Sequence, residues 1–124
     1  MFRYTALTLG LWAAVVPGFS LAETSDAESL LIKQGYFWQA QDKPKRAAES
    51  WEKVLLLDAS QPDALYGLGI IAVERAQLPR AQAYLQRLQA IEPLPRQALQ
   101  LEQDIRLAAP ANKQLLEQAR LLVD

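Results

Sequence analysis

The chain has 124 residues, enough for one ordinary domain, and carries 13 basic and 14 acidic side chains with neither histidine nor cysteine. The lack of these two residue types excludes histidine-based catalytic triads, thiol nucleophiles and ordinary zinc sites. It also excludes disulfides, so packing alone must hold the fold together. A net charge of −1 has the wrong sign for a nucleic-acid-binding protein.

The first 22 residues have the layout of a secretory signal peptide. Arg3 supplies the positive start, an apolar run follows, and Ser20-Leu21-Ala22 provides the small residues of a cleavage site. We therefore expect an exported chain that begins at Glu23 with a short leader over 23–27. An uncleaved membrane anchor is the alternative, although the apolar run of roughly 15 residues is short for a bilayer span of about 20.

The middle of the chain contains the same pattern twice. When the sequence is shifted against itself so that Leu31 aligns with Leu65, identical or similar residues coincide at several positions. The further pairs are Gly35 with Gly69, Arg46 with Arg80, Ala47 with Ala81, Val54 with Leu88, Leu57 with Ile91 and Asp58 with Glu92. We call this separation the repeat period, since such self-similarity is the signature of a repeat architecture. We assign residues 28–61 to repeat 1 and residues 62–95 to repeat 2.

Each repeat is predicted to be a helix, a break and a second helix, because its apolar residues recur at helical spacing. Proline explains the breaks, since it lacks an amide proton and fits best in the first turn of a helix. The breaks are Asp42-Lys43-Pro44 and Gln77-Leu78-Pro79 within the repeats, 58–62 between them, and Glu92-Pro93-Leu94-Pro95 after the second. Ser60 or Gln61 is expected to cap the helix that begins at Pro62.

This pattern of helical hairpins, with a period of about 34 residues, resembles the tetratricopeptide repeat family. The resemblance implies an all-α solenoid. The matching residues are Leu31, Gly35, Trp38, Ala47 and Trp51 in repeat 1, and Leu65, Leu68, Gly69, Ala81 and Pro93 in repeat 2. Gln34, Ala59 and Ala72 depart from the family pattern at single positions.

The small residues of this pattern have a steric role. Gly35 with Ala47, and Gly69 with Ala81, are expected to let paired helices approach closely. Bulky side chains, namely Trp38, Trp51 and Leu85, then fill the space between neighbouring hairpins. The alternative for the two tryptophans is stacking on sugar rings.

The pattern loosens after Pro95. One amphipathic helix is predicted over 96–109, ended by Pro110, and another over 111–124 with a clear apolar stripe. The last helix is either the first half of a truncated repeat or the partner of the preceding helix in a divergent third hairpin. Because such solenoids usually need about three units and a polar capping helix, we expect a fragment of a longer protein or a chain that completes its core on a partner.

The polar residues point away from catalysis. Scattered carboxylates and the basic cluster Lys43, Lys45 and Arg46 are expected to lie on solvated helix faces. The segment 67–72 spells a dinucleotide-binding fingerprint, but it lies inside a predicted helix instead of between a strand and a helix. We therefore expect no enzyme: no catalytic residues, no cofactor and no metal.

The resemblance to tetratricopeptide repeats also implies a partner-binding groove lined by the first helices of successive hairpins. Its expected residues in this chain are Ile32, Tyr36, Gln39, Tyr66, Ile70 and Val73. Apolar side chains on a face that the hairpin core does not need are typical of sites that bind a peptide or helix. Alternatively, these side chains pack against adjacent repeats or against the last helices.

An export signal followed at once by such hairpins, with the tail LLEQARLLVD, resembles the amino-terminal region of the outer-membrane export subunit of bacterial cellulose synthases. The resemblance implies a non-catalytic periplasmic scaffold for exopolysaccharide export. Its implied partners are other proteins of a secretion or envelope complex, with polysaccharide nearby, no nucleic acid, and membrane contact only through the signal peptide, through partners or through a missing carboxyl-terminal part. An independent periplasmic adaptor for a protein tail and a glycan-binding module are the alternatives.

Overall fold

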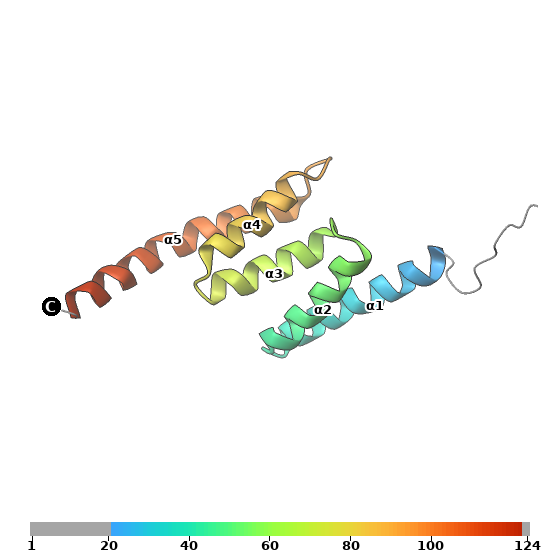
Figure 1. Cartoon of the computed structure of the whole chain (residues 1–124), viewed down its shortest axis with the longest axis horizontal. Coiled ribbons are helices and arrows are strands. Elements are labelled where there is room, and N and C mark those ends of the chain that lie inside the picture. Colours follow the sequence, from blue (N-terminus) through green and yellow to red (C-terminus); the bar gives the residue numbers. More distant parts are fainter. Residues whose placement is uncertain (1–20, 123–124) are drawn as a thin grey trace, which may run out of the picture.

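The computed structural model describes residues 21–122, which form five α-helices and no strand. The helices are α1 (Leu21–Ala40), α2 (Pro44–Leu57), α3 (Pro62–Glu74), α4 (Leu78–Gln89) and α5 (Arg96–Leu122). Figure 1 shows them laid side by side in chain order. The prediction of an all-α stack of helical hairpins is therefore confirmed. The predicted signal peptide lies outside the described residues, apart from its last two.

The helix boundaries follow the sequence signals closely within the two repeats. Pro44 and Pro62 are the first residues of α2 and α3, and Pro79 lies in the first turn of α4. Gln61 caps α3, because its side-chain oxygen accepts a hydrogen bond of 2.8 Å from the backbone amide of Ala64. At its amino end, α1 begins at Leu21, so the expected leader over 23–27 is part of this helix.

The turns inside the two hairpins have the same backbone geometry. Asp42 and Ala76, which stand one repeat period apart, both adopt a left-handed conformation, with φ of 54° and 59°. The next amide in each turn, that of Lys43 or Gln77, donates back across the helix end to Trp38 or Ala72, at 2.9 and 2.8 Å. This pattern is a Schellman motif, which satisfies carbonyl groups that the helix end would leave unpaired. The sequence repeat is thus also a repeat of local structure.

The hairpins pack in order along the chain. Helix α1 contacts α2, and α3 contacts α4; α3 also lies against α2, and α5 lies against both α3 and α4. Two buried clusters result. The first contains Ala47, Trp51, Val54, Ala64, Leu68 and Ile71, and the second contains Leu65, Ala72, Ala81, Leu88, Ala98, Leu101 and Ile105. Each cluster draws on neighbouring hairpins, so the stacking itself builds the core.

Trp51 is the largest side chain of the first cluster. It is fully buried, and a methyl group placed on Gly35 of α1 or on Gly67 of α3 would lie 2.6 Å from the Cε2 atom of its indole ring. The ring therefore fits between the first helices of two successive hairpins, as the sequence predicted for a bulky residue at this position. Its complete burial rules out sugar stacking on Trp51. Among the described residues, its Nε1 group has no hydrogen-bond partner.

Gly69 has a different neighbour from the expected one. A methyl group at this position would lie 2.5 Å from the side chain of Leu101 on α5. Gly69 therefore makes room for α5, the helix that follows the second hairpin. The sequence had instead predicted a close approach between Gly69 and Ala81. The dinucleotide-like segment that contains Gly67 and Gly69 lies wholly inside α3, where both glycines serve packing.

The expected helix end at Pro110 is wrong, because α5 continues through this residue to Leu122. Proline removes the hydrogen bond that an amide at position 110 would donate, but most of the surrounding residues are strong helix formers. The apolar residues of α5 recur every three or four positions over most of its length, at 98, 101, 105, 108, 115, 119 and 122. Pro110 lies on an exposed part of the helix, where a missing amide does not disturb this stripe.

Candidate partner-binding face

Asp63 joins three helices on the face built by α1, α3 and α5. Its carboxylate accepts hydrogen bonds from the Tyr36 hydroxyl of α1 at 2.8 Å and from the Gln97 amide of α5 at 3.0 Å. Gln61, just before α3, donates a longer bond of 3.4 Å to the other carboxylate oxygen. Because Asp63 lies in the first turn of α3, the helix dipole also favours its negative charge.

A second polar contact joins α3 to α5 on the same face. The hydroxyl of Tyr66 donates a hydrogen bond of 3.1 Å to the carboxylate of Asp104. Together with the bonds at Asp63, it fixes how the first helices of the hairpins lie beside one another. Such side-chain bonds between elements specify one arrangement in a way that apolar contacts alone do not.

The protonation states of these groups follow from their surroundings. Partial burial, then the bond to a carboxylate and its negative charge, raise the pKa of both Tyr36 and Tyr66 to about 12. Burial alone would raise the pKa of Asp63, but hydrogen bonds from Gln97, Tyr36 and Gln61, with the nearby charge of Arg96, bring it below its usual value. At neutral pH the face therefore carries neutral phenols and an ionised Asp63.

The structure separates the six expected groove residues into two groups. In the first hairpin, Tyr36 is 46% exposed, Gln39 is half-buried, and Ile32 packs against the first cluster. In the second hairpin, Tyr66, Ile70 and Val73 are half-buried and pack against the cluster that includes Leu101 of α5. The packing alternative therefore fits Ile32 as well as the second group. The most open part of the face lies at Tyr36, and its use by a partner stays a prediction.

Gln97 and Asp104 are members of this face that sequence reasoning missed. Gln97 stands one repeat period after Asp63, so the period, extended past Pro95, places both at the same point of a first helix. Leu99 likewise stands one repeat period after Leu65. The period was therefore the signal that could have found Gln97. Asp104 has no counterpart of this kind, because Ile70 occupies the equivalent position.

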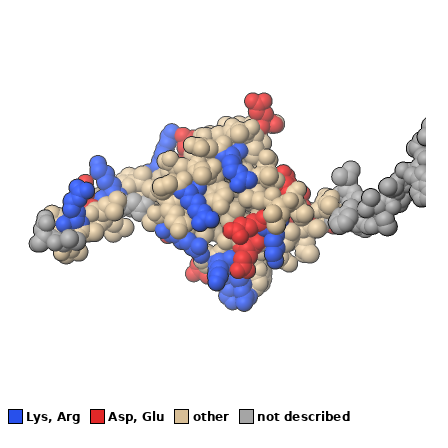
Figure 2. All heavy atoms as spheres, viewed as in Figure 1, with Lys and Arg blue, Asp and Glu red and all other residues tan. Residues whose placement is uncertain are grey.

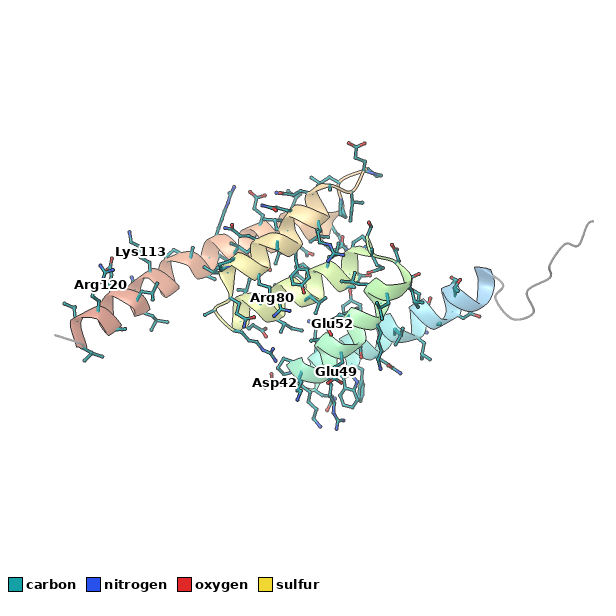
Figure 3. The ribbon with its side chains drawn as sticks, viewed as in Figure 1. Asp42, Glu49, Glu52, Arg80, Lys113 and Arg120 are labelled. Atoms are coloured by element: carbon teal, nitrogen blue, oxygen red, sulfur yellow. The ribbon has the colours of Figure 1, made fainter. Side chains whose placement is uncertain are left out.

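The other charged residues were surveyed for a further site on the visible side of the molecule and for a metal site. On the side seen in Figure 2, acidic and basic side chains are interspersed. Figure 3 shows Glu49 and Glu52 on α2, with Arg80 on α4; Glu52 and Arg80 line a small hollow of about 80 Å³ between helices. Within residues 21–122, no group of three acidic side chains is placed to hold a metal ion, and no helix has the length and hydropathy to cross a bilayer.

Comparison with known proteins supplies two relatives. Over 122 residues the chain is 57% identical to "Cellulose synthase operon protein C" of Pseudomonas fluorescens (strain SBW25). Over 80 residues it is 39% identical to the protein of the same name from Xanthomonas axonopodis pv. citri (strain 306). The chain is homologous to part of cellulose synthase operon protein C. The resemblance to a cellulose synthase subunit that was drawn from the sequence is thereby confirmed.

The relatives are much longer than this chain. The match to the Pseudomonas protein covers 98% of the chain but only 10% of that relative, and the match to the Xanthomonas protein covers 64% of the chain and 5% of that relative. No family model matches the sequence. No solved structure matches it either. The relatives' name therefore describes proteins of which this chain corresponds to a small segment.

Proposed function

We propose that this chain is a non-catalytic periplasmic scaffold that holds proteins of a cellulose-synthesising and exporting complex together. The observation that carries the proposal is the 57% identity to cellulose synthase operon protein C over almost the whole chain. The stack of hairpins supports it, because solenoids present extended surfaces for protein partners. The signal-like first 22 residues support export from the cytoplasm.

The side chains also favour binding over catalysis. The tyrosines of the face are neutral at physiological pH, and its carboxylates accept hydrogen bonds from neighbouring helices. With no histidine or cysteine in the chain, the residues most often used for acid–base and nucleophilic catalysis are missing. The most open part of the face, around Tyr36 and Gln39, is the proposed partner surface.

A deletion in the producing cell tests this function. Removing the coding segment for residues 28–95 should abolish cellulose output, measured by a fluorescent cellulose-binding dye. The glucan synthase activity of isolated inner membranes should stay unchanged, because a scaffold takes no part in the chemistry. Undiminished cellulose output, or a matching fall in membrane synthase activity, would refute the proposal.

Photocrosslinking tests the partner surface itself. A photoreactive amino acid at position 36 or 39 should crosslink the chain to another protein of the cellulose complex in living cells. The matched control is position 56, since Leu56 is 86% exposed and belongs to α2, which contributes no residue to this face. Equal crosslinking at position 56, or none at 36 and 39, would reject this surface.

A further inference from the structure

Helix α1 has a face that corresponds to a buried face of the later first helices. One repeat period apart, positions 30, 33, 34 and 37 correspond to positions 64, 67, 68 and 71 of α3. In α3, all four are buried: Ala64, Gly67, Leu68 and Ile71. In α1 they are Leu30, Lys33, Gln34 and Phe37, all exposed, with Leu30 58% and Phe37 54% accessible. Among the described residues, no helix covers this face.

The exposed face of α1 carries a shallow depression that is largely open to solvent. Lys33, Gln34, Phe37 and Trp38 line an open concavity of about 440 Å³. Phe37 belongs to neither buried cluster, so the fold does not need its ring for packing. An exposed aromatic side chain that the core does not use is a feature of a binding surface.

Trp38 is held in place at the edge of this concavity. Its ring meets that of Phe37 edge-on, with centroids 4.9 Å apart. The guanidinium of Arg46 lies 4.6 Å from the Trp38 centroid, and the ammonium of Lys43 lies 5.7 Å from it. These cation–π contacts fix the ring and engage both cations. Phe37 therefore presents an exposed ring beside the half-buried Trp38, which also packs against the first cluster, and Lys33 is the charged group of the concavity.

The residue types decide which kind of ligand fits. Another apolar helix is disfavoured, because Lys33 stands where α3 has Gly67 and α5 has Leu101, and a packed helix would bury its charge. A sugar chain suits the mixture: the C–H faces of pyranose rings pack on aromatic rings, while their hydroxyl groups bond to an ammonium and an amide. We propose that Phe37, Trp38, Lys33 and Gln34 form a binding site for a neutral, extended glucan chain.

This site deepens the proposed function, on which it rests, by giving the scaffold a direct contact with the exported polymer. It lies on the side of α1 that positions 33 and 37 share, whereas Tyr36 bonds to Asp63 on the face shared with α3 and α5. Protein partners and glucan would therefore use different surfaces of the first hairpin.

Titration of the full chain, as exported, with cellohexaose tests the proposal. We expect saturable shifts of the backbone amide resonances of residues 33–38 at millimolar sugar, and a much weaker response to maltohexaose, whose α-linked chain is coiled. Phe37→Ala should weaken binding at least tenfold and leave the circular dichroism spectrum unchanged. Leu56→Ala, which removes an exposed apolar side chain from α2, should bind like the parent.

Three results would overturn the proposal: no saturable response to cellohexaose, an unchanged affinity in Phe37→Ala, or an equal response to maltohexaose. Binding of poly-glutamate at residues 33–38 in place of the sugar would instead identify an acidic polypeptide as the ligand and also reject it. The proposed scaffold function is tested separately. A flat sugar titration with intact crosslinking at position 36 would reject only the glucan site, whereas lost crosslinking with intact sugar binding would reject only the partner surface.

Discussion

Trp51 shows how one side chain sets the spacing of two hairpins. Its ring fills the room left by Gly35 and Gly67, which come from successive first helices. The sequence indicated this role in part, because Trp51 stands at a core position of the repeat. It did not indicate that Gly67, which falls outside the matched pattern, provides half of the space.

Gly35→Ala is expected to destabilise the chain by about 1–3 kcal/mol, because the added methyl group overlaps the indole ring and forces a shift of packed elements. Urea denaturation measures the loss. Ser29→Ala, on an exposed position of the same helix, is the control and should have little effect. Gly35→Ala should cost less stability when it is introduced into Trp51→Phe than when it is introduced into the parent, because the smaller ring leaves room for the methyl group. An unchanged midpoint in Gly35→Ala would contradict the packing described here.

Asp63 makes the chain sensitive to acid. Since its pKa is lower in the folded than in the unfolded chain, its stabilising contribution is present above the unfolded value of 3.8 and is lost as pH falls through the folded value. Asp63→Asn should therefore be less stable than the parent at neutral pH, and the difference should shrink below pH 3.8. Urea midpoints across this range measure it. A difference that grows on acidification would contradict the assigned sign.

Tyr36→Phe provides a matched comparison for this acid response. It removes one of the hydrogen bonds that lower the pKa of Asp63 and leaves the others in place. The acid-dependent part of the stability should then be smaller than in the parent but larger than in Asp63→Asn. Equal behaviour of Tyr36→Phe and the parent would mean that the Tyr36 bond contributes nothing.

At the scale of helices and turns, the two hairpins have the same backbone conformation in the turns between their helices. Asp42 and Ala76 hold the same left-handed conformation although their side chains differ. For Ala76 this conformation is costly, because the Cβ atom crowds the following carbonyl, by about 1–2 kcal/mol. The sequence could not show this strain, since alanine gives no sign of a positive φ.

Ala76→Gly should raise the unfolding free energy by about 1 kcal/mol, because glycine adopts this conformation without the steric cost. Thermal and urea unfolding both report the gain. Ala90→Gly is the matched control, since Ala90 ends α4 with an ordinary φ of −80°, and it should give no gain. A loss of stability in Ala76→Gly would argue against the left-handed turn.

The continuity of α5 is the element that sequence reasoning missed, because proline usually ends a helix. Its apolar stripe resumes beyond position 110, and Pro110 itself is exposed. The first half of the stripe is buried, whereas Leu115 and Leu122 are 61% and 87% exposed. A pattern in one sequence shows the stripe but not how far the neighbouring helices extend along it.

Pro110→Ala tests this continuity. In a continuous helix it restores a backbone hydrogen bond and should slow amide hydrogen exchange in the turns on both sides of position 110, since an interior proline costs about 3 kcal/mol relative to alanine. Pro79→Ala, in the first turn of α4, should change little because proline is tolerated there. Unchanged exchange around position 110 would place a turn at Pro110, as the sequence first indicated.

At the scale of the whole molecule, the described part of the chain is a short stack whose core is made between hairpins as much as within them. The repeat period predicted the hairpins, their breaks and the buried role of Trp51. The candidate face was harder to predict, because the packing of Tyr66, Ile70 and Val73 depends on α5, whose position the sequence did not specify. The bonds that cross this face, at Asp63 and Asp104, depend on the same packing.

The most direct test of the stacking is a nuclear Overhauser experiment on the Trp51 ring. If successive first helices enclose this ring, its protons should give cross-peaks to the α protons of both Gly35 and Gly67 in the same molecule. Cross-peaks to only one of the two glycines, or to neither, would contradict the stacked arrangement on which the proposed scaffold function depends.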